Sequence, residues 1–257
     1  MPEETVDLDK ICYKKNFLSK VIARVNYKTI SDFDLPKELA EKLKEVFQIM
    51  EPVKMTGTEF QITGPEISAK SSEITEWHFF GKAREKKLTV SQEAFFVEFD
   101  AYESFEKLKE DFLTVFDKFT SVYGEVLQIN FFGLRYINNI DIPEEEPLNW
   151  TKYIKEKMLD TFNFAKSEIE SDDFLSRAFQ ILEYNYGDFN LRYQFGMPNP
   201  DYPAPIRRKY YVLDLDTFYS GQQEVTDIKE NIDKFHKCIQ TAFEKSITEE
   251  LRGAMNE

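Results

Sequence analysis

Histidine and cysteine, the side chains that most often bind zinc or act as nucleophiles, occur only twice each in this chain of 257 residues. They are His78, His236, Cys12 and Cys238. A structural zinc site needs about four ligands at short spacings, and residues at positions i and i+2 of a helix, such as His236 and Cys238, point to different faces. A cysteine nucleophile also needs a histidine base beside it. We therefore predict no catalytic residue, no metal ligand and no cofactor.

The motifs that bind phosphates or expose a nucleophile are also missing. The nine glycines are scattered and form neither a GxGxxG nor a GxxxxGKS/T loop, and no GxSxG elbow occurs. Asp214 and Asp216 share one face of a predicted strand, where they would either hold a divalent cation or be a solvated or salt-bridged pair. We favour the solvated or salt-bridged pair. These observations favour a protein without enzymatic activity, with an unrecognised hydrolase as a minor alternative.

The segment from Gly133 to Ile140, with the sequence GLRYINNI, is the most distinctive polar stretch. Because side chains alternate along a strand, we expect Arg135 and Asn139 on one face and Tyr136 and Asn138 on the other. The Arg135 guanidinium either pairs with an acidic residue of the sheet, which we favour, or presents its donors to a ligand. The candidate binding residues are Arg135, Tyr136, Asn138, Asn139 and Arg192.

The charge balance constrains the partners. The chain has 33 Lys and Arg against 47 Asp and Glu, a formal net charge of −14. Nucleic-acid binding depends on clustered basic side chains that contact phosphates, so this balance argues against a nucleic-acid partner, although a local basic patch is compatible with it.

Cysteine usage and the N-terminal residues indicate the compartment. Two cysteines near opposite ends do not form a disulfide framework, and the acidic sequence MPEETVD is no signal peptide. No apolar run approaches the roughly 20 residues that span a bilayer. We therefore expect a cytoplasmic protein that does not associate with membranes.

Hydrophobic periodicity predicts an α+β protein. The segment from Glu59 to Ile62 indicates a short strand, and Gly64-Pro65 with the Ser-rich stretch after it indicates a loop. The longer predicted strands cover 17–27, 94–100, 127–142, 179–186, 189–195 and 210–218, and the predicted helices cover 34–50, 104–119, 149–162 and 227–247.

These elements form two similar halves, each with a strand, a helix, three or four strands and a second helix. The spacing supports a duplication, because fourteen residues separate Gly81 from Phe95 and fourteen separate Gly196 from Tyr210. Two such β-α-β(3-4)-α units would join into a largely antiparallel sheet with helices on one face, a saddle-like topology analogous to that of the TATA-binding protein. The predicted parts are a tail at 1–16, halves at 17–124 and 125–250 packed as one globular unit, and a tail at 251–257.

The GLRYIN stretch, its position in the middle of the chain, and the terminal stretch from Phe235 to Thr248 resemble a sporadically distributed family of uncharacterised bacterial proteins of about this length. The resemblance covers nearly the whole chain and has most of its specificity in GLRYIN. It implies no catalytic residue, because the family has no assigned activity, and the patchy distribution implies a phage-related or defence locus. Many relatives are expected to carry a basic residue where Asn139 stands, so a charge there is not essential.

The sequence leads us to expect a non-enzymatic binding protein that recognises a protein partner and also self-associates, for instance as a homodimer. One alternative is a nucleic-acid binder, which predicts a contiguous basic or aromatic patch on the open face of the sheet. Another is a small-molecule or nucleotide sensor with a pocket between the halves.

Overall fold

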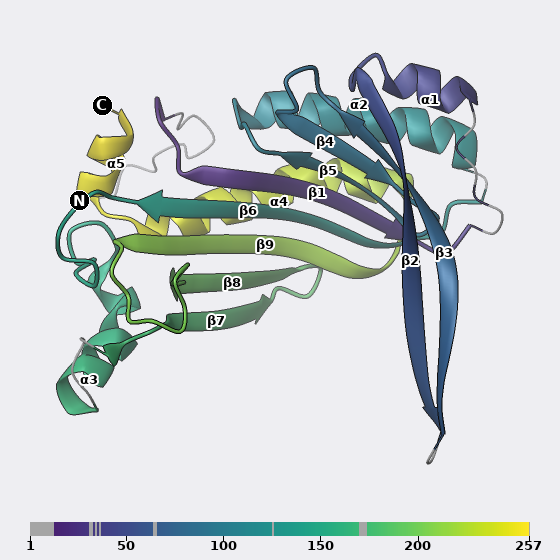
Figure 1. Cartoon of the computed structure of the whole chain (residues 1–257). Helices are drawn as coiled ribbons and strands as arrows, with labels where there is room; N and C mark the ends of the chain where they lie inside the picture. Colours follow the sequence, from purple (N-terminus) through teal and green to yellow (C-terminus); the bar gives the residue numbers. More distant parts are fainter. Residues whose placement is uncertain are drawn as a thin grey trace. The chain divides into compact units, whose positions relative to one another are not determined.

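The computed structural model describes residues 13–30, 33, 35, 37–63, 66–124, 126–169 and 174–256, with the backbone alone described for 54–75 and 166. Within these ranges nine strands form one open antiparallel sheet in the order β2-β3-β4-β5-β1-β6-β9-β8-β7, and five α-helices accompany it (Figure 1). The predicted α+β class is therefore confirmed. Cys12, Asp34, Pro36 and the Gly64-Pro65 turn lie outside the described residues.

Along the chain, helices separate runs of one to four strands, and the chain ends with two helices. The strands are β1 (Leu18–Tyr27), β2 (Ile49–Thr63), β3 (Glu66–Phe80), β4 (Lys86–Val90), β5 (Ala94–Phe99), β6 (Ile129–Asp141), β7 (Ala178–Asn185), β8 (Asn190–Met197) and β9 (Tyr210–Gln223). The helices are α1 (Lys37–Leu43), α2 (Phe105–Tyr123), the 3-10 helix η2 (Glu156–Met158), α3 (Asp160–Glu168), α4 (Val225–Ser246) and α5 (Glu249–Asn256).

The chain divides into two compact units that do not coincide with the predicted halves. One unit contains residues up to Val21 together with Leu134–Tyr219 and Asn231–Glu257, and the other contains Ile22–Gly133 and Ser220–Glu230. The sequence order places a boundary at residue 124, but β1, β6, β9 and α4 each contribute residues to both units.

The unit that contains α2 has a core rich in phenylalanine. Ser104 begins the helix as predicted, because its side chain accepts a hydrogen bond from the Lys107 N–H at 3.2 Å. Phe112 and Phe116 of this helix both lie 5.9 Å from Phe95 of β5, between ring centroids. Stacked aromatic rings bury much apolar surface, so these contacts hold α2 against the sheet within this unit.

In the other unit, α4 packs on the sheet through its predicted apolar stripe. Ile232, Phe235 and Ile239 are fully buried, and the Phe235 ring lies 5.4 Å from that of Phe189, just before β8. The helix begins at Val225 rather than near Asp227, because the Asp227 carboxylate accepts the backbone N–H of Glu224 at 2.8 Å and acts as the third residue of the first turn.

The predicted helix at 149–162 is wrong in its first half. Residues 149–155 form turns, followed by η2, and α3 begins only at Asp160. The apolar residues have helical spacing, but the backbone here forms hydrogen bonds with residues distant in the chain. The Lys155 N–H donates to the Ser246 carbonyl at 2.9 Å, and the Thr248 N–H donates to the Tyr153 carbonyl at 3.0 Å.

The Ser-rich stretch predicted as a loop is a strand. β2 and β3 pair from Ile49 opposite Phe80 to Thr63 opposite Glu66, whereas β4 pairs with only the last four residues of β3. Gly, Pro and Ser are common in turns and loops, so the local pattern indicated a loop. The backbone hydrogen bonds to the partner strand form a ladder that this local pattern does not encode.

Both predicted tails contain folded residues. Residues 251–256 belong to α5, with Leu251 and Met255 buried. The Tyr13 hydroxyl donates to Glu244 at 2.7 Å, and the Lys15 N–H donates to the Met255 carbonyl at 2.9 Å. Short terminal segments become ordered when such contacts tie them down.

The equal spacing that suggested a duplication joins unlike elements. Between Gly81 and Phe95 lies the strand β4, whereas the described residues between Gly196 and Tyr210 contain a loop and no strand. The duplicated unit therefore stays a prediction that this spacing does not support.

Replacing Phe112 by alanine tests the α2 core. We expect Phe112→Ala to lower the free energy of unfolding by about 3–5 kcal/mol, because it leaves a cavity among stacked rings. Urea unfolding followed by circular dichroism measures the change. The control Val122→Ala, on an exposed position of the same helix, should change stability by less than about 0.5 kcal/mol, and equal effects of the two variants would contradict the packing described.

Candidate functional site

The five predicted binding residues lie on two faces of the sheet. The alternation predicted for β6 is confirmed, since Tyr136 and Asn138 are buried and Arg135 and Asn139 are half-buried. The Tyr136 hydroxyl is hydrogen-bonded to Nδ1 of His236 at 3.0 Å, and the Asn138 side-chain amide donates to the Leu213 carbonyl at 3.2 Å. Tyr136 and Asn138 therefore fasten the sheet and α4 from inside, where a partner does not reach.

Arg135 and Arg192 both form ion pairs with carboxylates. Two guanidinium nitrogens of Arg135 donate to the two carboxylate oxygens of Asp214 on β9, at 2.8 and 2.6 Å. Arg192 donates to Glu183 at 2.6 Å and lies over the Phe218 ring. A bidentate pair of this kind holds both partners in one geometry. The structure thus supports the structural interpretation of Arg135 that the sequence favoured.

Asp216 lies beside these pairs, and among the described residues no cation forms a hydrogen bond with its carboxylate. Burial raises the pKa of its carboxyl to about 6, the Asp214 charge adds to the rise, and Arg135 and Arg192 oppose it. In the strand register Asp216 lies opposite Arg192. Within the ranges that the structure describes, no three His, Cys, Asp or Glu side chains gather as a metal site.

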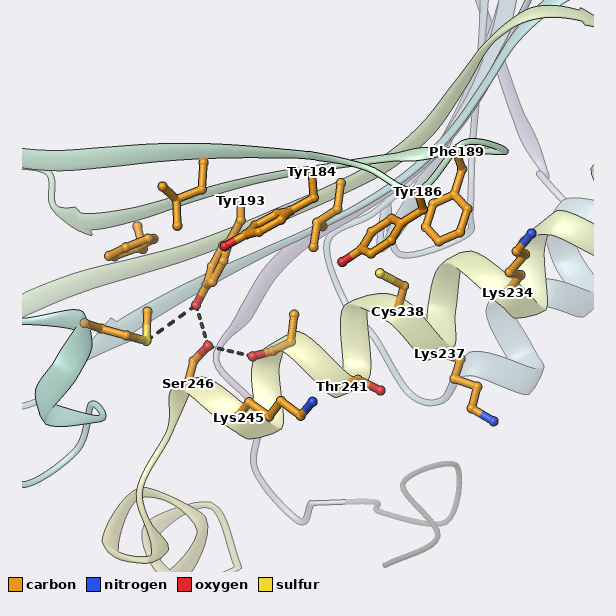
Figure 2. A pocket seen from close by; sticks show the side chains of 15 residues that line it. Tyr184, Tyr186, Phe189, Tyr193, Lys234, Lys237, Cys238, Thr241, Lys245 and Ser246 are labelled. Atoms are coloured by element: carbon orange, nitrogen blue, oxygen red, sulfur yellow. Dashed lines mark hydrogen bonds between the residues drawn. The ribbon is translucent and has the colours of Figure 1, made fainter. Parts of the chain in front are cut away.

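A groove that the sequence did not predict lies between β7, β8 and α4 (Figure 2). Its volume is about 570 Å³, within the usual range of ligand pockets. The sheet supplies apolar and aromatic side chains, and α4 supplies the polar ones. The lining residues are Met158, Leu182, Tyr184, Tyr186, Phe189, Leu191, Tyr193, Phe195, Lys234, Lys237, Cys238, Thr241, Ala242, Lys245 and Ser246.

The groove is positive in an acidic protein. Three of its lining residues are lysines, and none of the fifteen is Asp or Glu. Lys234 pairs with Asp188 and lies 5.1 Å above the Phe189 ring. Lys237 and Lys245 have no ion-pair partner among the residues that the structure describes. Two exposed ammonium groups are thus available at the side of an apolar groove (Figure 2).

Polar groups inside the groove are held in place and show no nucleophilic pair. The Tyr193 hydroxyl and Ser246 Oγ are 2.5 Å apart, and Ser246 donates on to the Ala242 carbonyl at 2.6 Å. Cys238 faces Tyr186, and burial raises the pKa of its thiol, an effect that the Tyr186 hydrogen bond partly opposes. A thiol whose pKa is raised is a weaker nucleophile at neutral pH.

The strand β7 forms the outer wall of the groove and one edge of the sheet. It pairs with β8, and the sheet order ends with it. Gly196 of β8 permits their close approach: its φ is +145°, and a Cβ there would lie 2.1 Å from the Ala178 carbonyl oxygen. The strand exposes apolar side chains on both faces, with Ile181 60% and Tyr186, just beyond its end, 50% exposed.

Residues 179–186 were predicted as a strand, and their apolar and aromatic side chains fall on both faces, which is more typical of a strand buried on both sides. The structure places this sequence at an edge instead. The exposed large apolar residues there include Phe174, Phe179, Ile181, Leu182, Tyr184 and Tyr186. An apolar sequence in a strand that the fold leaves exposed is the signal that points to this surface.

A second cavity of about 810 Å³ lies beside Trp150. Its lining includes apolar residues such as Phe162 and Ile206, together with Glu145, Glu146 and Arg207. Because both acidic and basic side chains line this cavity, its lining does not favour an anionic ligand, whereas the lysines of the groove do.

The comparisons with known proteins add no relative. No protein-family model matches the chain, and a search of curated proteins finds no match. In the described part of the chain, every helix is too short or too polar to cross a lipid bilayer.

Replacing Asp216 by asparagine tests the electrostatics of the arginine pairs. The folded carboxyl has a pKa of about 6 against an ordinary 3.8, so the native protein keeps a proton that the unfolded chain has lost. The free energy of unfolding therefore falls as pH rises between these values. The whole loss of stability that Asp216 causes, which we call the deficit, is present above about pH 6. Asp216→Asn removes the deficit and should stabilise the protein by about 2 kcal/mol at neutral pH and not at all below about pH 3.5.

The measurement is urea unfolding across this pH range, with Asp141→Asn at an exposed position of β6 as the control. The control variant should follow the wild-type pH profile. A stabilisation by Asp216→Asn that is equal at all pH values, or a destabilisation at neutral pH, would show that burial does not dominate at Asp216.

Proposed function

We propose that this protein is a non-enzymatic binding protein that recognises a protein partner, and that the partner adds an extended segment to the edge of β7. The observation that carries the proposal is the exposed apolar surface of β7 on an open sheet edge. Addition of a strand to such an edge is a common mode of peptide recognition, in which the backbone supplies affinity and alternate side chains supply specificity.

The sequence of β7 supports this proposal. Natural proteins protect edge strands with lysines, prolines, bulges or short length. The eight residues of β7, AFQILEYN, contain neither lysine nor proline. The one charged residue, Glu183, is held by Arg192 in an ion pair. An edge that lacks these protections is expected to be covered by a partner, because exposed apolar patches of this kind mark interaction sites.

The nucleic-acid alternative has less support. It requires unpaired basic side chains on the open face of the sheet, whereas Arg135 is bound by Asp214 and Arg192 by Glu183. The net charge of −14 opposes it as well. The small-molecule alternative predicts a pocket between the halves, whereas the groove lies inside one compact unit, beside the exposed edge strand. A groove in this place suits a peptide whose backbone can pair with the edge strand.

We also propose that the two halves derive from a repeated unit. Support comes from the sheet order, in which β1 and β6, the first strands of the halves, are neighbours. The next strand beside β1 is β5, which directly precedes α2 in the chain, and the next strand beside β6 is β9, which directly precedes α4. The cytoplasmic location, the phage-related or defence context and the saddle-like topology belong to the same proposal and rest on the sequence.

Replacing Ile181 by lysine tests the edge-strand proposal. Ile181 is exposed, so the fold should tolerate the change, while a charge on the edge disfavours an added strand. We expect the variant to bind a partner, captured from the native cells and then purified, at least 10-fold more weakly by calorimetry. Val122→Lys, at an exposed position of α2, is the matched control and should bind like the wild type.

Amide hydrogen exchange of the complex should show protection at residues 178–185. The proposal fails if no specific partner is captured and the protein is a monomer by light scattering. It also fails if the purified partner binds Ile181→Lys with unchanged affinity.

A further inference from the structure

The groove faces the space that a strand added to β7 would occupy. Leu182 and Tyr184 of β7 both line it, and Figure 2 shows Tyr184 on the side of the strands that looks toward α4. These two residues therefore mark the face of the strand that looks toward α4. Side chains alternate along any neighbouring strand as well. Every second side chain of an added segment would therefore point toward the groove, and the others would point away from it.

The groove wall selects apolar side chains at its base. Leu191 and Phe195 are buried in its floor, and Tyr193 is fixed there by Ser246. An apolar side chain that enters this space removes aromatic surface from water and gains about 25 cal/mol for each Å² buried. The floor offers few free hydrogen-bonding groups, so a polar side chain would enter at a cost.

The α4 side of the groove selects negative charge. Lys237 and Lys245 lie on this side, and neither has an ion-pair partner among the described residues. Electrostatic interactions fall off over about 8 Å at physiological ionic strength. An approaching carboxylate would therefore respond to these nearby ammonium groups more than to the net charge of −14 spread over the whole chain.

We propose that the segment that adds to β7 is acidic, with apolar side chains directed into the groove and Asp or Glu side chains placed to reach Lys237 and Lys245. This inference rests on the proposed function, and it names the chemistry of the partner. A second copy of the chain fits less well: the edge strand AFQILEYN that it would bring has one carboxylate, which Arg192 already holds. An acyl chain with a carboxylate shares the apolar and anionic character but lacks a backbone that pairs with the edge.

The test uses short fluorescent peptides and fluorescence anisotropy. The acidic probe carries the sequence Glu-Ser-Leu-Ser-Phe-Ser-Glu, flanked by Gly-Ser for solubility, so that both Glu side chains lie on the same face of the strand as Leu and Phe. A second probe has Gln in place of each Glu, a third is the acidic peptide with alternate backbone amides methylated, and laurate serves as the acyl competitor. The acidic probe should bind at least 5-fold more tightly than the Gln probe at low salt, and added salt should reduce this difference.

The matched variants separate the lysines from general charge. The double variant Lys237→Gln with Lys245→Gln should abolish the difference between the acidic and Gln probes while it keeps binding of the Gln probe. Lys28→Gln with Lys82→Gln, two exposed lysines far from the groove in sequence, makes the same change in net charge and should keep the difference.

Two groups of outcomes decide between the proposals. If the acidic probe binds no more tightly than the Gln probe, or does not bind, the acidic-segment inference is overturned, and partner capture with Ile181→Lys still decides the proposed function. Both strand addition and the inference are overturned if the methylated probe binds as tightly as the unmethylated one. They are also overturned if laurate displaces the acidic probe completely and Ile181→Lys does not change the affinity for the probe.

Discussion

The contact of α4 with the sheet at Phe189 is the interaction on which the candidate site depends. Phe235 packs against Phe189 with 5.4 Å between ring centroids, the His236 ring is held by the Tyr136 hydroxyl, and Ser246 at the end of the helix is held by Tyr193. These contacts fasten one side of α4 along its length, so the neighbouring side, with Lys237, Thr241 and Lys245, stays beside the exposed edge. A groove of defined shape exists because the helix cannot roll away from the strands.

The distribution of charge separates structure from recognition in this unit. On the strands, Arg135 and Arg192 are each bound to a carboxylate, so their charges stabilise local geometry and are not free for a partner. On α4, Lys237 and Lys245 lie at the side of a groove whose lining contains no carboxylate. A desolvated ion pair contributes little net stability once formed, but an unpaired ammonium beside an apolar surface can still gain a partner. The lysines are for this reason the better candidates for recognition than the arginines.

An exposed strand edge is a hazard to a soluble protein unless it is covered, and the groove gives a physical reason for which partner covers it. The edge supplies unpaired backbone groups to any extended chain. The apolar floor and the lysines then discriminate among chains by their side chains, since specificity is a difference in affinity between competing partners. The same arrangement makes a nucleic acid a poor occupant, because in the described groove lining its phosphates would meet two unpaired lysines in a protein of net charge −14.

The sequence by itself determined the elements with strong local signals: the α+β class, the alternation of β6 with Tyr136 and Asn138 inward, the Ser104 cap and the apolar stripe of α4. It also led us to favour a structural role for Arg135. Only the tertiary structure decided which strand lies at the edge, and that backbone hydrogen bonds to Ser246 and Thr248 hold Lys155 and Tyr153 out of a helix. It also decided that Tyr184 and Lys245 line one groove, although about sixty residues separate them. Periodicity reports how one element meets its surroundings, whereas an edge or a groove is a relation between elements distant in the chain, which no local pattern encodes.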